Sequence, residues 1–315
     1  MILTVTLNPA IDKILILNGF EIHKLHRLDS REMSMTVPGG KGVNIALNLN
    51  ILGDDVIATG FAGGHEGHLL CDSLRQNGIT TSFIFTEGST RTNTSILDVL
   101  NETLTEINDI GQVVPEEDLI FLLESYERLL NRVDMVVLAG SLPQGVIEDV
   151  YRQMIIMAQG HGIKVLLHAA PKYTDPLIDA GAFLINPDMR SYHQFMGRPL
   201  DGVDAFIQAG REIIAYQKDT EFVIFTHRIE NVVAVTRKQS YILRPRDLKI
   251  VNMLGYADAY LAGFIHAYRQ NLPTTDVLRY ASAAGLTNIE MLYKEIRNPD
   301  KITANLGRID VEEVS

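Results

Sequence analysis

Pro38-Gly39-Gly40-Lys41-Gly42-Val43-Asn44-Ile45-Ala46 is the stretch of sequence that decides the fold. Its glycines let the backbone approach a ligand closely, and the apolar run that follows predicts a helix over residues 43–52. The start of such a helix offers free N–H groups and a positive dipole end to an anion. Lys41 adds a charge, and Asn44 can hydrogen-bond a hydroxyl. The spacing is not that of a Walker A loop, and a purely structural turn before a helix remains open.

On both sides of this loop, short β-branched runs alternate with longer amphipathic stretches. The sequence predicts strands at 2–6, 56–60, 135–139, 164–168, 183–185 and 222–225. It predicts helices at 43–52, 67–77, 115–131, 147–160, 203–217, 257–270 and 274–293. Alternation of this kind indicates an α/β fold with a parallel sheet covered on both faces. Ligands in such folds bind at the carboxyl ends of the strands.

Two segments, 13–37 and 91–107, break the alternation because both have strand-like polarity and no helix between strands. They predict a small sheet that projects from the main body. Such a sheet can cover a site and exclude water, can pair with a second subunit, or can be an ordinary extension of a sheet edge. Although 315 residues would suit two average domains, α/β folds of this length often form one, so we expect a single domain over 1–315.

Composition excludes several classes of protein. The net charge of −11 argues against a nucleic-acid surface, which needs a basic patch. No apolar stretch reaches the ~18 residues of a membrane span, and residues 1–7 read as a strand rather than a secretory leader. The one cysteine, Cys71, cannot form an internal disulfide and is expected to be a buried apolar residue in a protein of the reducing cytoplasm.

A second informative stretch is Val251-Asn252-Met253-Leu254-Gly255-Tyr256-Ala257-Asp258. An apolar helix is predicted to begin near Ala257, with Asp258 in its first turn. A carboxylate there can simply complement the helix dipole. It can also act as a general base, taking a proton from a hydroxyl while backbone amides hold a phosphoryl group.

On the basis of these stretches, the sequence resembles the ribokinase-like (PfkB) family of sugar kinases. Within that family it is most similar to the 1-phosphofructokinase and tagatose-6-phosphate kinase branch. The resemblance lies in the opening run 6–12, in Gly39-Gly40-Lys41-Gly42 with Asn44, and in the runs 90–93, 105–108, 140–143 and 255–264. It implies a ribokinase-like sandwich with a mostly parallel central sheet. It also implies that segments 13–37 and 91–107 form a β-sheet lid. Because a lone small sheet is marginally stable by itself, we expect these segments to pair between subunits and give a homodimer.

The resemblance also implies a set of site residues. Sugar and sugar phosphate would be bound by Asp12, Arg27, Gly39, Gly40, Lys41, Asn44, Arg91 and Ser141. Asp258 would be the catalytic base, beside an anion hole of Gly255, Tyr256 and Ala257. ATP would lie against Thr226, Arg228, Asn231 and Asn288, and Mg²⁺ would be held by Asp188.

The nucleotide side departs from the family's patterns. Gly255-Tyr256-Ala257-Asp258 stands where the family has Gly-Ala-Gly-Asp, so Tyr256 is expected to intrude on the phosphate path. The run 226–231 lacks both glycines of the family's nucleotide loop. In the run 186–191, Ser191 replaces the glutamate that organises magnesium, and His168 begins a run that replaces the branch's Asp-x-Ser-Gly.

Two hypotheses of different classes follow. The first is an ATP-dependent kinase of a ketohexose phosphate, such as fructose 1-phosphate or tagatose 6-phosphate, which the presence of Asp258 favours. The second is a sugar-phosphate sensor with impaired or absent catalysis, which the altered nucleotide side favours.

Overall fold

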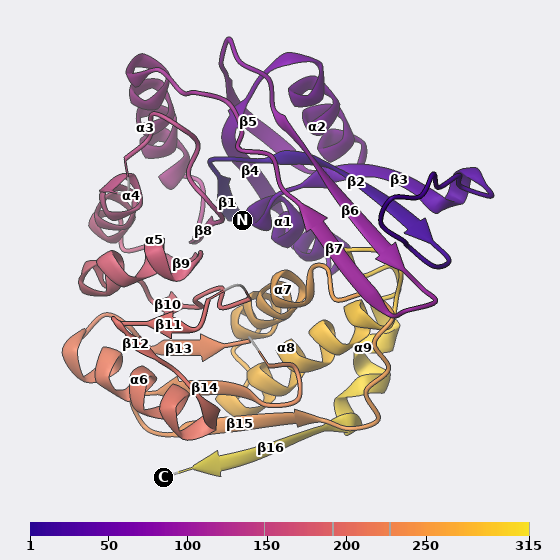
Figure 1. Ribbon diagram of the computed structural model, residues 1–315. Helices are drawn as coiled ribbons and strands as arrows, with labels where there is room; N and C mark the ends of the chain where they lie inside the picture. Colours follow the sequence, from indigo (N-terminus) through magenta and orange to yellow (C-terminus); the bar gives the residue numbers. More distant parts are fainter. Residues whose placement is uncertain (148, 191, 227, 315) are drawn as a thin grey trace.

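A ten-stranded sheet forms the centre of the protein in the computed structural model, which describes residues 1–147, 149–190, 192–226 and 228–314. Its strand order is β16-β15-β14-β13-β10-β9-β8-β1-β4-β5, stacked from bottom to top in Figure 1. The parallel strands are β1 (Ile2–Thr6), β4 (Val56–Ala62), β5 (Thr80–Phe85), β8 (Met135–Ala139), β9 (Lys164–His168), β10 (Leu184–Ile185) and β13 (Phe222–Phe225). Antiparallel strands extend one edge: β14 (Val232–Thr236), β15 (Ser240–Pro245) and β16 (Ile309–Val314).

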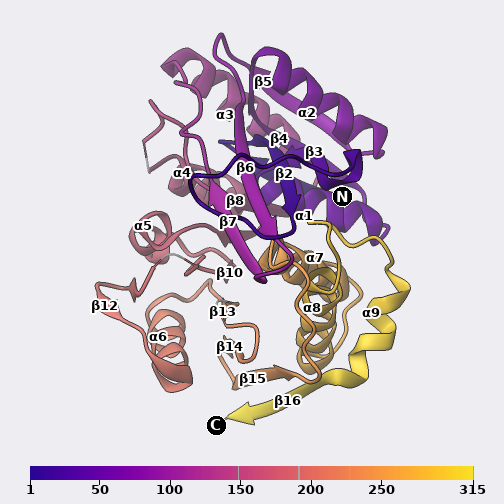
Figure 2. The same cartoon turned by 45° about the vertical axis from the view of Figure 1, so that its right-hand side comes forward.

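Helices cover both faces of this sheet (Figures 1 and 2). One face carries α1 (Lys41–Ile51), α2 (Gly64–Gln76), α7 (Tyr256–Arg269), α8 (Thr274–Ile289) and α9 (Asp300–Asn305). The other carries α3 (Glu116–Leu130), α4 (Asp149–Gly160), the short α5 (Pro171–Thr174) and α6 (Gly202–Tyr216). Among the described residues, no helix combines the length and apolarity that a membrane crossing requires.

Alternation along the strands divides the buried apolar residues into two cores. Along β1, Ile2 belongs to the core beneath α1 and α7, whereas Leu3 and Val5 belong to the core beneath α3 and α4. Because both faces of the parallel strands are buried, the strands read as continuous apolar runs in the sequence. Cys71 is buried, as expected from the sequence.

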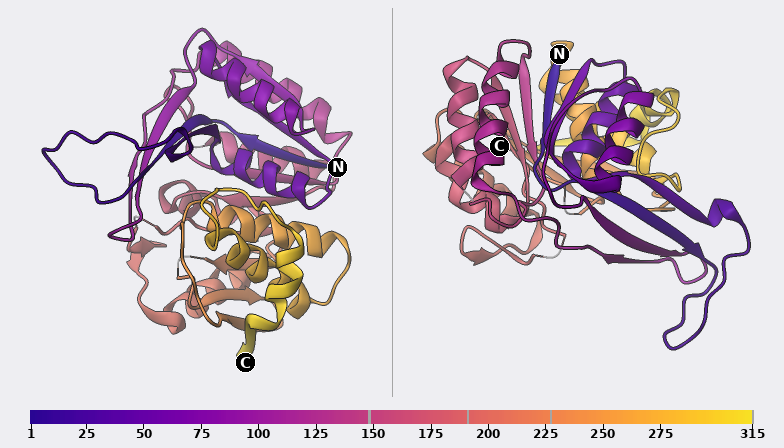
Figure 3. Two further views of the ribbon diagram at one scale, coloured as in Figure 1. Left: turned by 90° about the vertical axis from the view of Figure 1, so that its right-hand side faces the viewer. Right: turned by 90° about the horizontal axis from the view of Figure 1, so that it is seen from above.

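A separate four-stranded sheet, here called the small sheet, projects from the main body (Figure 3). Its order is β3-β2-β6-β7, built from β2 (Ala10–Leu17), β3 (Ser34–Gly39), β6 (Arg91–Asp98) and β7 (Thr103–Ile107). The pair β2–β6 is parallel and the other two pairs are antiparallel. Asp98 anchors the sheet's far end, since its carboxylate accepts hydrogen bonds from the backbone N–H groups of Gly19 and Phe20.

The fold confirms the predicted α/β class and most predicted elements. The strands predicted at 2–6, 135–139, 164–168 and 222–225 coincide with β1, β8, β9 and β13. The segments 13–37 and 91–107 supply the small sheet. The sequence interpretation missed β5 and the antiparallel edge β14–β16, and it placed the end of α8 at residue 293 rather than at Ile289. Two remaining short elements are β11 (Gln194–Phe195) and β12 (Arg198–Pro199).

The close approach of α7 and α8 yields a first prediction. A Cβ at Gly263 of α7 would lie 2.6 Å from the Cβ of Ala284 in α8. Alanine normally stabilises a helix interior by about 1 kcal/mol over glycine, but overpacking a core costs about 1–3 kcal/mol. We therefore expect Gly263→Ala to lower the free energy of unfolding, measured by urea denaturation.

The matched control is Gly160→Ala, because a Cβ at the last residue of α4 meets no atom within 4 Å. That variant should keep or gain stability. Equal stability of both variants would show that α7 and α8 have room to separate.

Candidate active site

A cavity of about 390 Å³ opens at the carboxyl ends of the parallel strands, between the sheet and the small sheet. Its lining includes Asn8 after β1, Asp12 in β2, Ser141 after β8 and Asp188 after β10. It also includes the first turns of α1 and α7. Residues that are far apart in the sequence therefore meet at the edge where an α/β fold places its ligands.

The glycine loop before α1 fits closely around Asp12. A Cβ at Gly39 would lie 2.3 Å from Oδ2 of Asp12, so this carboxylate can rest against the loop because residue 39 is glycine. Gly40 precedes α1 with a φ of 107°, which side-chain-bearing residues rarely adopt. The loop thus turns β3 directly into α1 and brings Lys41 and Asn44 to the cavity.

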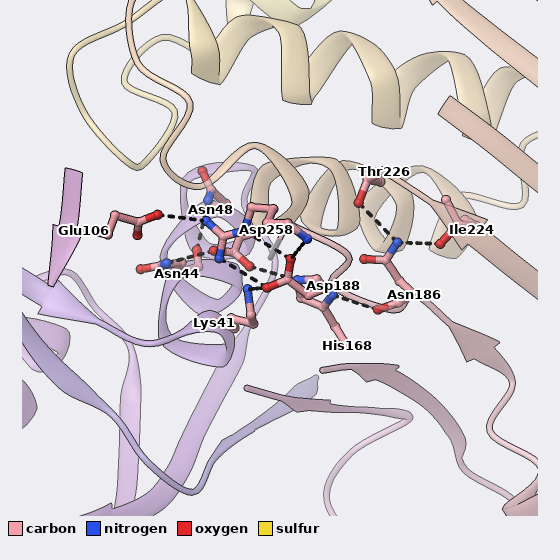
Figure 4. A network of polar contacts seen from close by, with 11 residues as sticks. Lys41, Asn44, Asn48, Glu106, His168, Asn186, Asp188, Ile224, Thr226 and Asp258 are labelled. Carbon is pink, nitrogen blue, oxygen red and sulfur yellow. Dashed lines mark hydrogen bonds and ion pairs between the residues drawn. The ribbon is translucent and has the colours of Figure 1, made fainter. Parts of the chain in front are cut away.

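Asp258 is held in the first turn of α7 by contacts from two other elements (Figure 4). Its Oδ2 accepts a hydrogen bond of 2.8 Å from Nδ2 of Asn44 on α1. Its Oδ1 lies 3.4 Å from Nε2 of His168 at the end of β9. Burial raises the pKa of Asp258, but contact with His168, the charge of Lys41 and the Asn44 hydrogen bond outweigh it and leave the pKa below its ordinary value. The carboxylate is therefore ionised at neutral pH and able to accept a proton.

A chain of alternating charges crosses the cavity from α1 to the small sheet. Nζ of Lys41 lies 2.6 Å from Oδ2 of Asp188, and Nε of Arg190 lies 3.1 Å from Oδ1 of the same carboxylate. Arg190 continues to Glu106 of β7, with 3.6 Å between its Nη1 and the carboxylate. Burial raises the pKa of Asp188, but the charges of Lys41 and Arg190 reverse this and hold it well below its usual range.

Lys294 is a cavity residue that the sequence interpretation missed. It follows α8, is almost fully buried, and its ammonium group is paired with Oδ2 of Asp12. The same nitrogen donates to the backbone oxygen of Pro38 at 3.2 Å and to Oδ1 of Asn44 at 3.3 Å. No motif surrounds Lys294 in the sequence, so the available signal was weak: a lone lysine after an apolar helix.

The residues expected to bind sugar phosphate are mostly brought together. The guanidinium of Arg91 donates to the backbone oxygens of Asp109 and Asn8, at 2.7 and 2.9 Å, and lines the cavity. Ser141 lies beside it, accepting a 3.3 Å hydrogen bond from Asn8. Arg27 is not part of this group, because it is exposed in the segment between β2 and β3 and does not line the cavity.

A second cavity of about 360 Å³ adjoins the first and shares Lys41, Asp188, Arg190 and Asp258 with it. Thr226, at the end of β13, and the turn Gly255–Ala257 also line it. Gly255 precedes α7 with a φ of 81°. The ring of Tyr256 is buried in the core against Gly285 of α8, so the expected intrusion of this ring on the phosphate path is wrong.

Three of the residues expected to contact nucleotide are engaged with the protein itself. Arg228 is paired with Asp201 at 3.4 Å, and Asn231 accepts a hydrogen bond from Arg244. Asn288 is fully buried and donates to the backbone oxygen of Lys294 at 2.7 Å. Two residues of the runs that depart from the family's patterns lie outside the described residues: Ser191 and His227.

Comparison with known proteins gives the family of this chain. Residues 14–296 match the model of the pfkB family of carbohydrate kinases. The chain belongs to this family. Among solved structures, a possible 1-phosphofructokinase from Thermotoga maritima has 29% sequence identity and a TM-score of 0.94, with 100% of each chain covered. Phosphofructokinase-2 from Escherichia coli, with 21% identity, a TM-score of 0.86 and 97% and 98% coverage, shares the fold.

The protein is accordingly a carbohydrate kinase, and the ribokinase-like fold expected from the resemblance is confirmed. Membership of the family implies use of a nucleotide, typically together with a metal. Asp188, the residue expected to hold Mg²⁺, is already engaged with other side chains in this structure. Both oxygens of Asp188 are paired with cations, and no group of three or more His, Cys, Asp or Glu in the described part of the chain could hold an ion.

Lys294 yields a second prediction. Replacing it with methionine in Lys294→Met leaves the carboxylate of Asp12 without its cation in a mostly buried position. Breaking a buried ion pair typically costs about 3–5 kcal/mol. We expect a loss of this order in urea denaturation, and recovery of most of it in the double variant Lys294→Met with Asp12→Asn.

Lys301→Met, at an exposed lysine of α9, is the matched control and should leave stability within about 0.5 kcal/mol. If Lys294→Met behaves like this control, the pair does not support the cavity.

Proposed function

We propose that this kinase transfers a phosphoryl group from ATP to a ketohexose phosphate of the fructose 1-phosphate or tagatose 6-phosphate kind, with Asp258 as general base. One observation carries the proposal. An ionised, buried carboxylate stands at the start of α7, at the junction of two cavities. One cavity holds polar and cationic groups suited to a sugar phosphate, and the other adjoins the strand end where the family's nucleotide is expected.

The reaction follows from this arrangement. Asp12 and Asn44 hydrogen-bond the sugar hydroxyls, and the free primary hydroxyl approaches Asp258. Asp258 takes the hydroxyl proton as the oxygen attacks the γ-phosphorus of ATP, whose bond to the bridging oxygen breaks to release ADP. Backbone N–H groups of the turn Gly255–Ala257 and the ammonium of Lys41 stabilise the charge that develops.

The substrate's own phosphate is assigned to Arg91, Ser141 and Lys41. A guanidinium is suited to a phosphate because its planar donors match two oxygens. Arg91 is held in place by two backbone oxygens, and its Nε has no hydrogen-bond partner among the described residues. The proposed substrate class is thus a sugar that already carries one phosphate.

No carboxylate with free oxygens is assigned to the metal, because both oxygens of Asp188 are paired with cations. ATP is expected to arrive as its magnesium complex, as is typical of the family. The ion would supply charge neutralisation on the phosphates, and we assign it no protein ligand. Both oxygens of Asp188 are already paired with Lys41 and Arg190. These two cations are therefore the protein groups that we expect to neutralise charge on the phosphates.

A second candidate function is supported by a specific observation. Arg228, Asn231 and Asn288 are engaged with the protein rather than presented to a cavity that a nucleotide would fill. A protein that binds sugar phosphate through the first cavity and transfers no phosphoryl group would be a sensor. The two functions differ in whether Mg-ATP binds and turns over.

The third prediction tests the base. With fructose 1-phosphate or tagatose 6-phosphate and Mg-ATP, Asp258→Asn should lower kcat by about 10²- to 10⁴-fold, the usual contribution of a general base. Its affinity for the sugar phosphate, measured by calorimetry, should stay within a few-fold.

The control Asp54→Asn removes a buried carboxylate that pairs with His266 and Arg269 near the opposite edge of the sheet. It should lose stability and keep kcat. If the wild type binds sugar phosphate but shows neither Mg-ATP binding nor turnover, the sensor function replaces the kinase function.

We also propose that the small sheet is a lid over the first cavity and the surface of a homodimer. The lid role is supported by Asp12, Arg91 and Glu106, which reach the cavity from its strands. The dimer is supported by exposed apolar side chains, Leu100 and Ile107 on the sheet and Ile22 and Leu25 beside it. Exposed apolar groups on a projecting sheet favour an interaction surface.

The fourth prediction concerns this surface. Light scattering should give the mass of a dimer at micromolar concentration, and Leu100→Glu with Ile107→Glu should give the monomer. The control Ile120→Glu, at an exposed position of α3, should leave the dimer intact. Monomer alone in the wild type would exclude the dimer.

A further inference from the structure

His168 lies against the proposed base and has no role in the reaction described so far. Its ring is fully buried at the end of β9. Nδ1 lies 2.9 Å from the backbone oxygen of Asn186, and Nε2 lies 3.4 Å from Oδ1 of Asp258. Nε2 and Oδ1 have no other hydrogen-bond partner in the part of the chain that the structure describes. The two atoms therefore face each other across a buried gap.

The contact at Nδ1 determines the protons on this ring. A backbone carbonyl oxygen can only accept a hydrogen bond, so Nδ1 of His168 carries a proton. A neutral ring would then turn the lone pair of Nε2 toward the Asp258 carboxylate, and two acceptors in a buried site repel each other. A second proton on Nε2 removes this conflict and creates a charge-assisted contact.

We propose that His168 is an imidazolium that orients Asp258 for proton transfer, and is thus a positioning residue for the reaction. This inference rests on the proposed function of Asp258. A separation of 3.4 Å is long for a finished hydrogen bond, and such contacts often tighten when substrate binds.

Orientation of Asp258 follows from the use of its two oxygens. Oδ1 is directed to His168 and Oδ2 to the side-chain amide of Asn44, so the carboxylate plane is fixed from both sides. An ionised carboxylate offers about four acceptor positions, and these two contacts use two of them. Since Asp258 lines both cavities, the remaining capacity serves the sugar hydroxyl.

The same contacts connect the base to the donor side (Figure 4). Asn186, whose backbone oxygen holds His168, donates from its side chain to the backbone oxygen of Ile224 at 2.6 Å and to Oγ1 of Thr226 at 3.3 Å. Thr226 lines the second cavity. A continuous path of hydrogen bonds and one ion pair therefore runs from the strand end near the donor to the base.

Two carboxylates and two cations surround His168. Asp258 on α7 faces it directly, and Asp188 after β10 also interacts with it electrostatically. Lys41 on α1 and Arg190 are the nearby cations, and both are paired with Asp188. Among the described residues, the side-chain hydrogen bond to Asp258 comes from the neutral amide of Asn44, and the charge of Lys41 also acts on this carboxylate.

Two substitutions separate positioning from support of the fold. His168→Asn keeps a donor at the place of Nδ1 and loses the contact with Asp258, whereas His168→Gln can place a donor at the position of Nε2. We expect His168→Asn to lower kcat by about 100-fold with little change in sugar-phosphate affinity, and His168→Gln to recover about tenfold of that loss.

His266→Gln is the matched control, because Nδ1 of His266 pairs with Asp54 at 2.8 Å, away from the cavity, and glutamine keeps a donor only at the place of Nε2. It should lower thermal stability and leave kcat unchanged. The inference would be overturned if His168→Asn changed stability alone, with a kcat equal to that of the wild type. Asp258 would still be the base in that case, provided that Asp258→Asn is inactive.

A measurement without turnover covers the case in which the kinase function fails. Nitrogen-15 NMR of the resting protein should show both ring nitrogens of His168 protonated, and Asp258→Asn should remove the proton from Nε2. A neutral His168 ring in the wild type would overturn the proposal whether or not the protein is a kinase.

Discussion

The hydrogen bond between Asn44 and Asp258 is the contact on which the site depends. It joins the first turns of α1 and α7, which are separated by more than 200 residues in the chain. Each helix must therefore begin at a fixed point on the carboxyl edge of the sheet. Gly40 and Gly255 make this possible because both adopt backbone conformations with positive φ just before their helices. The packing of α1 against α7 then places a carboxylate and a side-chain amide where a sugar hydroxyl could contact both.

Electrostatic compensation governs the rest of the cavity. Ionised groups removed from water are costly unless a partner lies nearby, and both Asp12 and Asp188 have one. Lys294 compensates Asp12, while Lys41 and Arg190 compensate Asp188. The site is thus preorganised without ligand, and a bound anion has to compete with Asp188 for Lys41. This competition would lower the affinity for an anion at Lys41.

The sequence predicted what local patterns encode. Short apolar runs mark buried strands, and for this reason the observed bounds were predicted for β1, β8, β9 and β13. The loop at 39–44 was found because clustered glycines before a helix let the backbone approach a ligand closely. Lys294 and His168 could not be found in this way, since their roles arise from tertiary contacts with Asp12 and Asp258. Arg27 shows the converse, because a residue whose role was implied by the resemblance is exposed and does not line the cavity.

The junction between the small sheet and the main body has a consequence for how this chain can vary in length. β3 ends at Gly39 and α1 begins at Lys41, so a single residue separates strand from helix. An α-helix turns about 100° per residue. One inserted residue at this junction would therefore rotate Asn44 away from Asp258 by more than a quarter of a turn. The interval between β3 and α1 is fixed in length, whereas the segment between β2 and β3, which extends away from the body, is free to lengthen or shorten.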